Sequence, residues 1–332
     1  MQRTSTGILY KLSLRQLVNR CGTNAILSNK PQSGLRLSQS LSGQGVNQRM
    51  KSLAIVVVHG IGRQSSPPPD NPYARTFSDK LYARVQGAVK RYGGKGAQTW
   101  FRDDVIWREC HYAHIFNDLQ AAYFSRINRA VRPSRLRRLV VDNLADAAAY
   151  RPDKTRRKGP YEAVHACVRR TLSQVEDEVS PEAPLIILAH SLGGHVISNY
   201  LWDAQANGEA DTFVGGARLS TLITFGCNIP LFLMGCAPAA IKAIEDPWRT
   251  TGRERCIAGP WWCNYYDRDD ALGYPLANLG GDYSDMAAKG ALSDHAINAG
   301  NLLTRWNTLS HNGYWTSKAF AEPVAQTILT HA

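Results

Sequence analysis

The chain alternates short apolar runs with longer amphipathic stretches. Short runs rich in apolar and β-branched side chains predict strands that are buried on both faces of a sheet. Longer stretches in which apolar residues recur every three or four positions predict helices. The strands are expected at residues 54–58, 105–113, 185–188, 219–225 and 260–266. The helices are expected at residues 73–92, 161–179, 196–205, 287–306 and 320–330, the first of them stopped by Gly93 and Gly94.

Strands that alternate with helices in this way are typical of an α/β fold. We therefore expect a mostly parallel central sheet with helices on both faces. No internal repeat and no linker divides the chain after Met50, so residues 50–332 are expected to form one domain.

Residues 115–158 differ from this regular pattern. Residues 115–150 predict one or two helices broken at Pro133, with an apolar-aromatic face and an Arg-rich middle, and residues 151–158 predict a charged loop. Residues 122–158 contain eleven Lys or Arg against three Asp. We interpret the segment as a helical, lid-like insert over a pocket. A basic amphipathic helix can also lie on an anionic membrane, whereas a solvated basic face on an ordinary helix is the simpler alternative.

The first 49 residues contain no Asp or Glu and are rich in Ser, Gln, Asn and Gly. This composition suits an organellar transit peptide, a short disordered leader, or translated sequence upstream of a true start at Met50. The position of Met50 directly before the first strong strand favours the last of these. The segment is therefore left out of the predicted fold.

The overall composition is ordinary for a soluble globular protein, with 44% hydrophobic and 20% charged residues. Seven cysteines without paired or metal-type spacing indicate free thiols in a reducing compartment. We expect a cytoplasmic protein, or an imported one if the leader is a genuine transit peptide. The net charge of +12 is concentrated in the leader and the insert, which argues against a nucleic-acid-binding protein.

The candidate chemistry begins at Ser191. It follows the apolar run 185–188 directly and precedes a predicted helix, in the sequence Ala-His-Ser-Leu-Gly-Gly. A serine on a sharp turn from strand to helix needs small neighbours, because the surrounding chain passes close to it. Gly193 and Gly194 meet this need, and Ala189 stands where the usual pattern has a glycine.

A second glycine turn follows the first predicted strand, in the sequence His-Gly-Ile-Gly at residues 59–62. The carboxyl ends of adjacent parallel strands meet at one edge of a sheet. The backbone N–H groups of Leu192 and of Ile61, or alternatively Gly62, can therefore converge on one developing oxyanion. His59 and His190 adjoin this place and are interpreted as structural supports.

Residues 219–241 carry no charge and are long enough to cross a bilayer. We reject a membrane span, because Gly, Pro and Asn interrupt the segment and its first half has the pattern of a buried strand. Residues 229–234 would then leave the sheet beside Ser191 and could form the wall of an apolar pocket. Ordinary core packing predicts the same residues.

A reactive serine also needs a base and an acid that orients the base. Here Ser191 is followed by an Asp cluster after residues 260–266 and by a His near the carboxyl terminus. The order Ser, Asp, His is that of the α/β-hydrolases. From about residue 51 onward the chain resembles an α/β-hydrolase-fold serine hydrolase of the broad esterase and lipase group. The motifs that carry the resemblance are Val-Val-Val-His-Gly-Ile-Gly, Ala-His-Ser-Leu-Gly-Gly, Asp-Asp-Ala-Leu-Gly-Tyr and Ser-His-Asn-Gly-Tyr-Trp.

The resemblance implies that Ser191 is the nucleophile, His311 the general base and Asp270 the acid that orients it. Asp270 is preferred to Asp267 because the acid in such enzymes often directly precedes a turn of small and hydrophobic residues. His311 is preferred to His295 because it lies in a Gly-containing loop with aromatic neighbours. His295 lies inside a helical pattern.

The expected function is hydrolysis of carboxylic acyl esters through an acyl-serine intermediate, without metal or organic cofactor. A small-molecule or lipid-like ester is the expected substrate, and the basic insert leaves its class open. One alternative is a phospholipase or thioesterase that acts at a membrane surface. Another is a hydrolase-like fold used only for binding or scaffolding. The complete set of Ser, Asp and His argues against that last reading, because drift would erase one of the three.

Overall fold

The computed structural model describes residues 49–60, 70–116, 149–151, 159–247, 259–300 and 308–332. The chain divides into two units, Met1–Gln48 and Arg49–Ala332, and the first lies outside the described residues. Most of the insert expected at residues 115–158 also lies outside them, so its helices and its membrane contact stay predictions.

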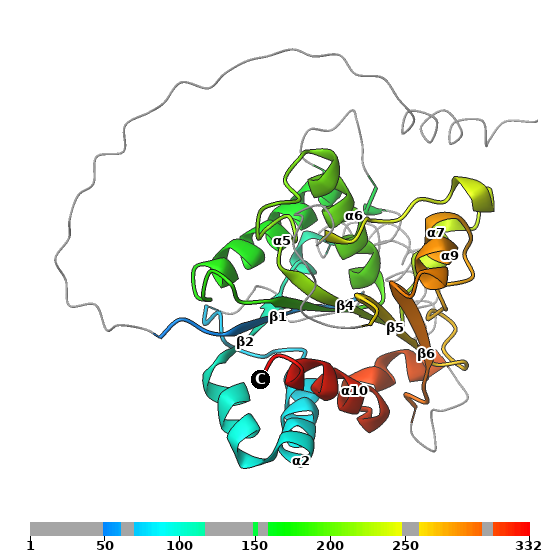
Figure 1. Ribbon diagram of the computed structural model, residues 1–332. Coiled ribbons are helices and arrows are strands. Elements are labelled where there is room, and N and C mark those ends of the chain that lie inside the picture. The colour runs from blue at the N-terminus through cyan, green and yellow to red at the C-terminus, as the bar shows by residue number, and fades with distance from the viewer. Residues whose placement is uncertain (1–48, 61–69, 117–148, 152–158, 248–258, 301–307) are drawn as a thin grey trace, which may run out of the picture. The chain divides into compact units, whose positions relative to one another are not determined.

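A six-stranded sheet forms the centre of the second unit, in the order β2-β1-β3-β4-β5-β6 (Figure 1). Every neighbouring pair is parallel. The predicted α/β fold with a parallel sheet is therefore confirmed. The strands are β1 (Leu53–Val58), β2 (Val105–Cys110), β3 (Leu185–His190), β4 (Leu219–Phe225), β5 (Trp262–Tyr266) and β6 (Leu292–Ala296).

Helices cover both faces of the sheet (Figure 1). The helices α5 (Pro160–Glu176) and α6 (Leu192–Ala206) lie on one face, and α2 (Asp79–Asp103) and α10 (Lys318–Leu329) lie on the other. Shorter elements connect the strands near the carboxyl edge and beyond β5. They are α7 (Ile229–Leu233), α9 (Gly281–Ala288) and the 3₁₀ helices η1 (Pro238–Ala240) and η2 (Thr308–Thr316).

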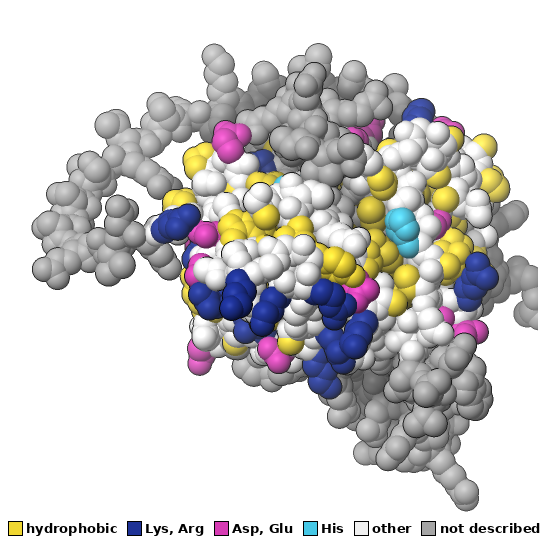
Figure 2. All heavy atoms as spheres, turned by 60° about the horizontal axis from the view of Figure 1, so that its bottom comes forward, with side chains coloured by type: hydrophobic (Ala, Val, Ile, Leu, Met, Phe, Trp, Pro, Cys, Tyr) yellow, Lys and Arg dark blue, Asp and Glu magenta, His cyan; other side chains and the backbone are white. Residues whose placement is uncertain are grey.

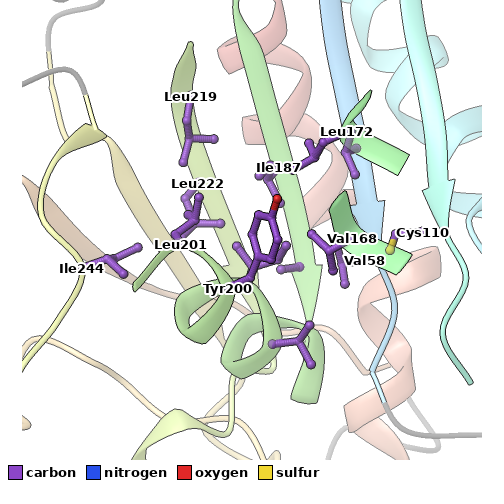
Figure 3. Close-up of a cluster of buried hydrophobic side chains, with 14 of the residues drawn as sticks. Val58, Cys110, Val168, Leu172, Ile187, Tyr200, Leu201, Leu219, Leu222 and Ile244 are labelled. Atoms are coloured by element: carbon purple, nitrogen blue, oxygen red, sulfur yellow. The ribbon is translucent and has the colours of Figure 1, made fainter. Parts of the chain in front are cut away.

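The central strands are apolar on both faces because each face packs under helices. Successive side chains of a strand point to opposite sides. Val56 and Val58 of β1 accordingly join the cluster that contains α5 and α6, whereas Ile55 and Val57 join the cluster that contains α2 and α10. Figure 3 shows the first cluster, in which Tyr200 of α6 lies over the sheet.

The helix expected at residues 73–92 differs from the observed one at both ends. It begins at Asp79, because the buried carboxylate of Glu109 accepts backbone N–H bonds from Thr76, Phe77 and Ser78 and holds this segment as a turn. Regular helix is interrupted at Gly94, which has φ 75° and ψ −170°, and then resumes as far as Asp103. The glycine pair thus breaks the helix without ending it.

The helix expected at residues 287–306 is wrong for residues 289–300, and residues 301–306 lie outside the described residues. Residues 292–296 form β6, an edge strand paired in parallel with β5. Asp294 stabilises this arrangement, because its carboxylate accepts bonds from the backbone N–H groups of Leu276 and Ala277 and from the Asn264 side chain. These partners are distant in sequence, and the polar centre of β6 does not show the apolar pattern of a buried strand. The strand was therefore not predicted.

The uncharged residues 219–241 form β4, α7 and η1, as expected of a segment that does not span a membrane. Of the helices in the described ranges, none has the length and apolar character needed to cross a bilayer. Lys and Arg side chains also gather on the face formed by α2 and α10 (Figure 2). They include the exposed Lys80, Arg84, Lys90 and Lys318, so the positive charge is less confined than its distribution along the sequence indicates.

Candidate active site

Ser191 stands between the end of β3 and the start of α6. Its backbone has φ 53° and ψ −123°, and it is the non-glycine residue with positive φ in the described part of the chain. Such a conformation costs about 1–3 kcal/mol and persists only where the surroundings impose it. Here the N–H of Ser191 donates to the carbonyl of Phe225, 3.0 Å away on β4. The side chain is thereby presented at the carboxyl edge of the sheet.

The two glycines after Ser191 let α6 approach the neighbouring chain. A Cβ atom on Gly193 would lie 2.6 Å from the carbonyl oxygen of His59 and 2.7 Å from that of Val58. A Cβ atom on Gly194 would lie 2.8 Å from Cys227 Sγ. The small residues of the elbow are therefore required by close packing, as the sequence indicated.

His311 reaches the serine from η2. Its Nε2 is 2.8 Å from Ser191 Oγ, although 120 residues separate them in the chain. His190 steadies this loop, since its Nε2 lies 2.9 Å from the backbone carbonyl of His311. A carbonyl only accepts, so Nε2 of His190 carries the proton. Burial, followed by the neighbouring His311, lowers the pKa of His190 to about 3, which keeps its ring neutral.

Asp270 holds the other side of the His311 ring. Its two carboxylate oxygens lie 3.0 and 2.9 Å from Nδ1 of His311. Burial by itself raises the pKa of Asp270, but the bonds from His311, from the N–H of Leu272 and from the hydroxyl of Tyr314 outweigh it. The net result is a lowered pKa, so the carboxylate stays ionised beside the ring.

Asp267 and His295, the rival residues, have other partners. The Asp267 carboxylate accepts backbone N–H bonds from Asp269, Ala299 and Gly300, and so ties together the loops after β5 and β6. His295 lies in β6 with its ring stacked on Tyr265 and its Nε2 2.6 Å from Ser293 Oγ. It is Asp270 and His311 that come together with Ser191.

Glycines also make room for the acid. Gly273 follows Asp270 by three residues, and a Cβ there would lie 2.5 Å from Asp270 Oδ2. Gly226, with φ 56°, comes directly after β4, and a Cβ there would lie 3.2 Å from the same oxygen. The motifs Asp-Asp-Ala-Leu-Gly-Tyr and Ser-His-Asn-Gly-Tyr-Trp contain Gly273 and Tyr314, but no role was predicted for either of them or for Gly226. The spacing of Tyr314, three residues after His311, was the available signal.

Of the two predicted oxyanion donors, Leu192 lies within the described residues and Ile61 does not. Leu192 is the first residue of α6, so its N–H has no intrahelical acceptor and lies at the positive end of the helix dipole. The chain that leads to Ile61 does pass beside Ser191, since a Cβ on Gly60 would lie 2.5 Å from Ser191 Cβ.

His59 braces this stretch of the chain. Its Nδ1 is 2.6 Å from the carbonyl of Gly60, and its Nε2 accepts the N–H of Tyr112 at 3.3 Å. The Tyr112 hydroxyl in turn donates to the carbonyl of His59. Burial lowers the pKa of His59 to about 4, so both ring nitrogens act in neutral hydrogen bonds.

The predicted pocket wall at residues 229–234 corresponds to α7 and the residue after it. Ile229 is buried, whereas Leu231 and Met234 are exposed by 38% and 78%. Phe232 stacks on the ring of His195 in α6, with centroids 4.0 Å apart. The apolar segment therefore lies against α6, the helix that directly follows Ser191.

The arrangement of Asp270, His311 and Ser191 can carry a proton away from a serine hydroxyl and return it. Across the described ranges, no group of three His, Cys, Asp or Glu side chains is placed to hold a metal ion. No protein-family model matches the chain, and no curated protein matches it either. The inference of function therefore depends on the geometry of the site.

Proposed function

We propose that this protein is a serine hydrolase of the α/β-hydrolase type, which cleaves carboxylic esters through an acyl-serine intermediate. The observation that carries the proposal is the hydrogen-bonded series from Asp270 through His311 to Ser191. Its two links measure 2.9 and 2.8 Å. The strained backbone of Ser191 is a second support, because strain of this kind gathers at functional sites.

In the proposed reaction, Ser191 Oγ attacks the ester carbonyl carbon while His311 Nε2 takes the hydroxyl proton. The carbonyl oxygen becomes an oxyanion, which the N–H of Leu192 and, we propose, that of Ile61 stabilise. One such donor contributes about 3–4 kcal/mol to lowering the barrier. The C–O bond to the alcohol then breaks, and the alcohol leaves with the proton from His311.

The acyl-serine is hydrolysed by the same groups. Water attacks the acyl carbon, gives its proton to His311, and the acid is released as the proton returns to Ser191 Oγ. In both halves Asp270 stabilises the protonated ring and keeps Nδ1 pointing away from Ser191. No metal or organic cofactor is needed for these steps.

The substrate we propose is an uncharged or lipid-like ester. The support is the apolar segment from Ile229 to Met234, which packs against α6 beside the elbow. Contact with an anionic membrane through the insert would rest on residues 117–148, which lie outside the described residues.

Replacing Ser191 by Ala tests the proposal. We expect Ser191→Ala to reduce hydrolysis of p-nitrophenyl butyrate to the background rate and to abolish labelling by a fluorophosphonate probe. Ser198→Ala is a matched control, because Ser198 is a buried serine in α6, the helix that directly follows Ser191. It should be labelled like the wild type. Labelling that survives in Ser191→Ala would refute the assignment, and a folded wild-type protein without labelling would favour a binding role.

A further inference from the structure

We propose that Tyr314 is a positioning residue of this site, whose hydroxyl group holds the Asp270 carboxylate in the orientation that bonds His311. The inference rests on the proposed function, because it concerns the same catalytic residues. It adds a fourth side chain to them, one that acts through Asp270.

The hydroxyl of Tyr314 has two partners. It lies 3.0 Å from Asp270 Oδ2 and 2.7 Å from the backbone nitrogen of Asp267. The backbone N–H can only donate, so the phenol oxygen accepts there. Its single proton is therefore available to Asp270. The direction of both hydrogen bonds follows from the chemistry of the groups.

The Tyr314 phenol keeps its proton and so remains a hydrogen-bond donor. Tyr314 is fully buried, and burial, followed by the charge of Asp270, raises its pKa far above the usual range. Its ring is held by Phe225 and Phe320, with centroids 5.9 and 6.2 Å away. The ring position thus depends on packing, and the hydroxyl is left to orient the carboxylate.

The 3₁₀ geometry of η2 explains why one short element can serve both the base and the acid. Residues three apart in a 3₁₀ helix lie on the same side. His311 and Tyr314 are three apart, and both reach the Asp270 carboxylate. The N–H of Leu272 holds Oδ1 at 2.9 Å. Tyr314 supplies the corresponding bond to Oδ2, so the carboxylate cannot turn away from His311.

Removing only the hydroxyl tests this role. In Tyr314→Phe, we expect kcat for p-nitrophenyl butyrate to fall about tenfold with little change in KM, since one hydrogen bond to a charged group is lost. Without the bond from Tyr314, the negative charge of Asp270 is neutralised less and interacts more strongly with the His311 ring, which favours the protonated form of that ring. The acid limb of the kcat/KM profile should therefore move to higher pH.

Tyr200→Phe is the matched control. Tyr200 is a buried tyrosine on α6 whose hydroxyl donates to the carbonyl of Val214 at 2.8 Å. Loss of the Tyr200 hydroxyl should lower the free energy of unfolding about as much as Tyr314→Phe does, and should leave the pH profile of kcat/KM unchanged. A Tyr314→Phe protein with wild-type kcat, or with an unmoved acid limb, would overturn the proposal.

A second variant keeps the test decisive if Tyr314→Phe does not fold. Site-specific 3-fluorotyrosine at position 314 retains the ring and makes the phenol a stronger donor. The acid limb should then move to lower pH, opposite to the effect of Tyr314→Phe, and an unmoved limb would overturn the inference. Fluorophosphonate labelling of the wild type distinguishes failure of the proposed function from failure of this inference. If the wild type is not labelled, the proposed function is wrong. If it is labelled, a negative result concerns only the role of Tyr314.

Discussion

At the scale of single residues, the two aspartates after β5 show how partners decide a role. Asp267 and Asp270 are both buried and lie three residues apart. The Asp270 carboxylate is hydrogen-bonded to His311, which in turn contacts Ser191. The Asp267 carboxylate instead accepts hydrogen bonds from backbone N–H groups of two loops. We therefore expect one substitution to affect chemistry and the other to affect stability.

Asp270→Asn should lower kcat/KM by about 10⁴-fold, because an amide favours the wrong tautomer of the His311 ring and does not stabilise its cation. Asp267→Asn should lower the free energy of unfolding by about 2 kcal/mol, because bonds from backbone N–H groups to a charged acceptor are weakened. Ester hydrolysis and urea unfolding measured on both proteins check this pair. The opposite assignment of the two effects would mean that Asp267 is the acid.

At the scale of elements, the approach of α6 to β1 depends on a residue without a side chain. Gly193 leaves no room for a Cβ between α6 and the backbone that ends β1. This contact sets the position of the helix whose N-terminus carries Ser191 and Leu192. A larger residue there would have to displace backbone, which is costlier than displacing the end of a flexible side chain.

Gly193→Ala should lower the free energy of unfolding by about 2 kcal/mol or more, through overpacking against the backbone, and should also lower ester hydrolysis. Gly87→Ala is its control on α2, where nothing lies within 4 Å of the added Cβ. It should raise stability by about 0.5–1 kcal/mol, because alanine loses less chain entropy in a helix. Urea unfolding with unchanged slope measures both, and a neutral Gly193→Ala would contradict the packing that we describe.

At the scale of the whole molecule, buried histidines make folding sensitive to acid. His59 and His190 are buried and neutral, with their pKa values lowered to about 4 and about 3 from 6.5 by burial. Below pH 6.5 the unfolded chain takes up protons on these rings and the folded chain does not. Stability is therefore lost as the pH falls from 6.5 towards the folded pKa values.

The loss amounts to about 1.4 kcal/mol per pH unit for each histidine within that window. His190→Asn should reduce the slope of unfolding free energy between pH 6 and pH 4.5 by about that amount, whatever its effect at neutral pH. Urea unfolding at several pH values gives the slope. An equal slope in the wild type and the variant would show that His190 titrates alike in both states.

Much of the fold and of the site follows from local patterns in the sequence. The apolar runs predict β1, β3 and β4 because a strand buried on both faces is apolar at most of its positions. The elbow is recognisable because the sharp turn at Ser191 needs Gly193 and Gly194 within three residues of it. These features are encoded by neighbours in the chain, so no knowledge of distant contacts is required.

Other features depend on residues that only folding brings together. Residues 292–296 have a polar centre, Ser-Asp-His, and form a strand through pairing with β5 and through the partners of Asp294. The choice between Asp267 and Asp270 depended on where η2 places His311, and the hydroxyl of Tyr314 acquired its partners in the same way. The sequence by itself determined the parallel sheet and the turn that carries Ser191. The sequence also favoured Asp270 as the acid, but only the tertiary structure brings Asp270 and its supporting bonds to the histidine, because these bonds join segments that are 41 to 120 residues apart.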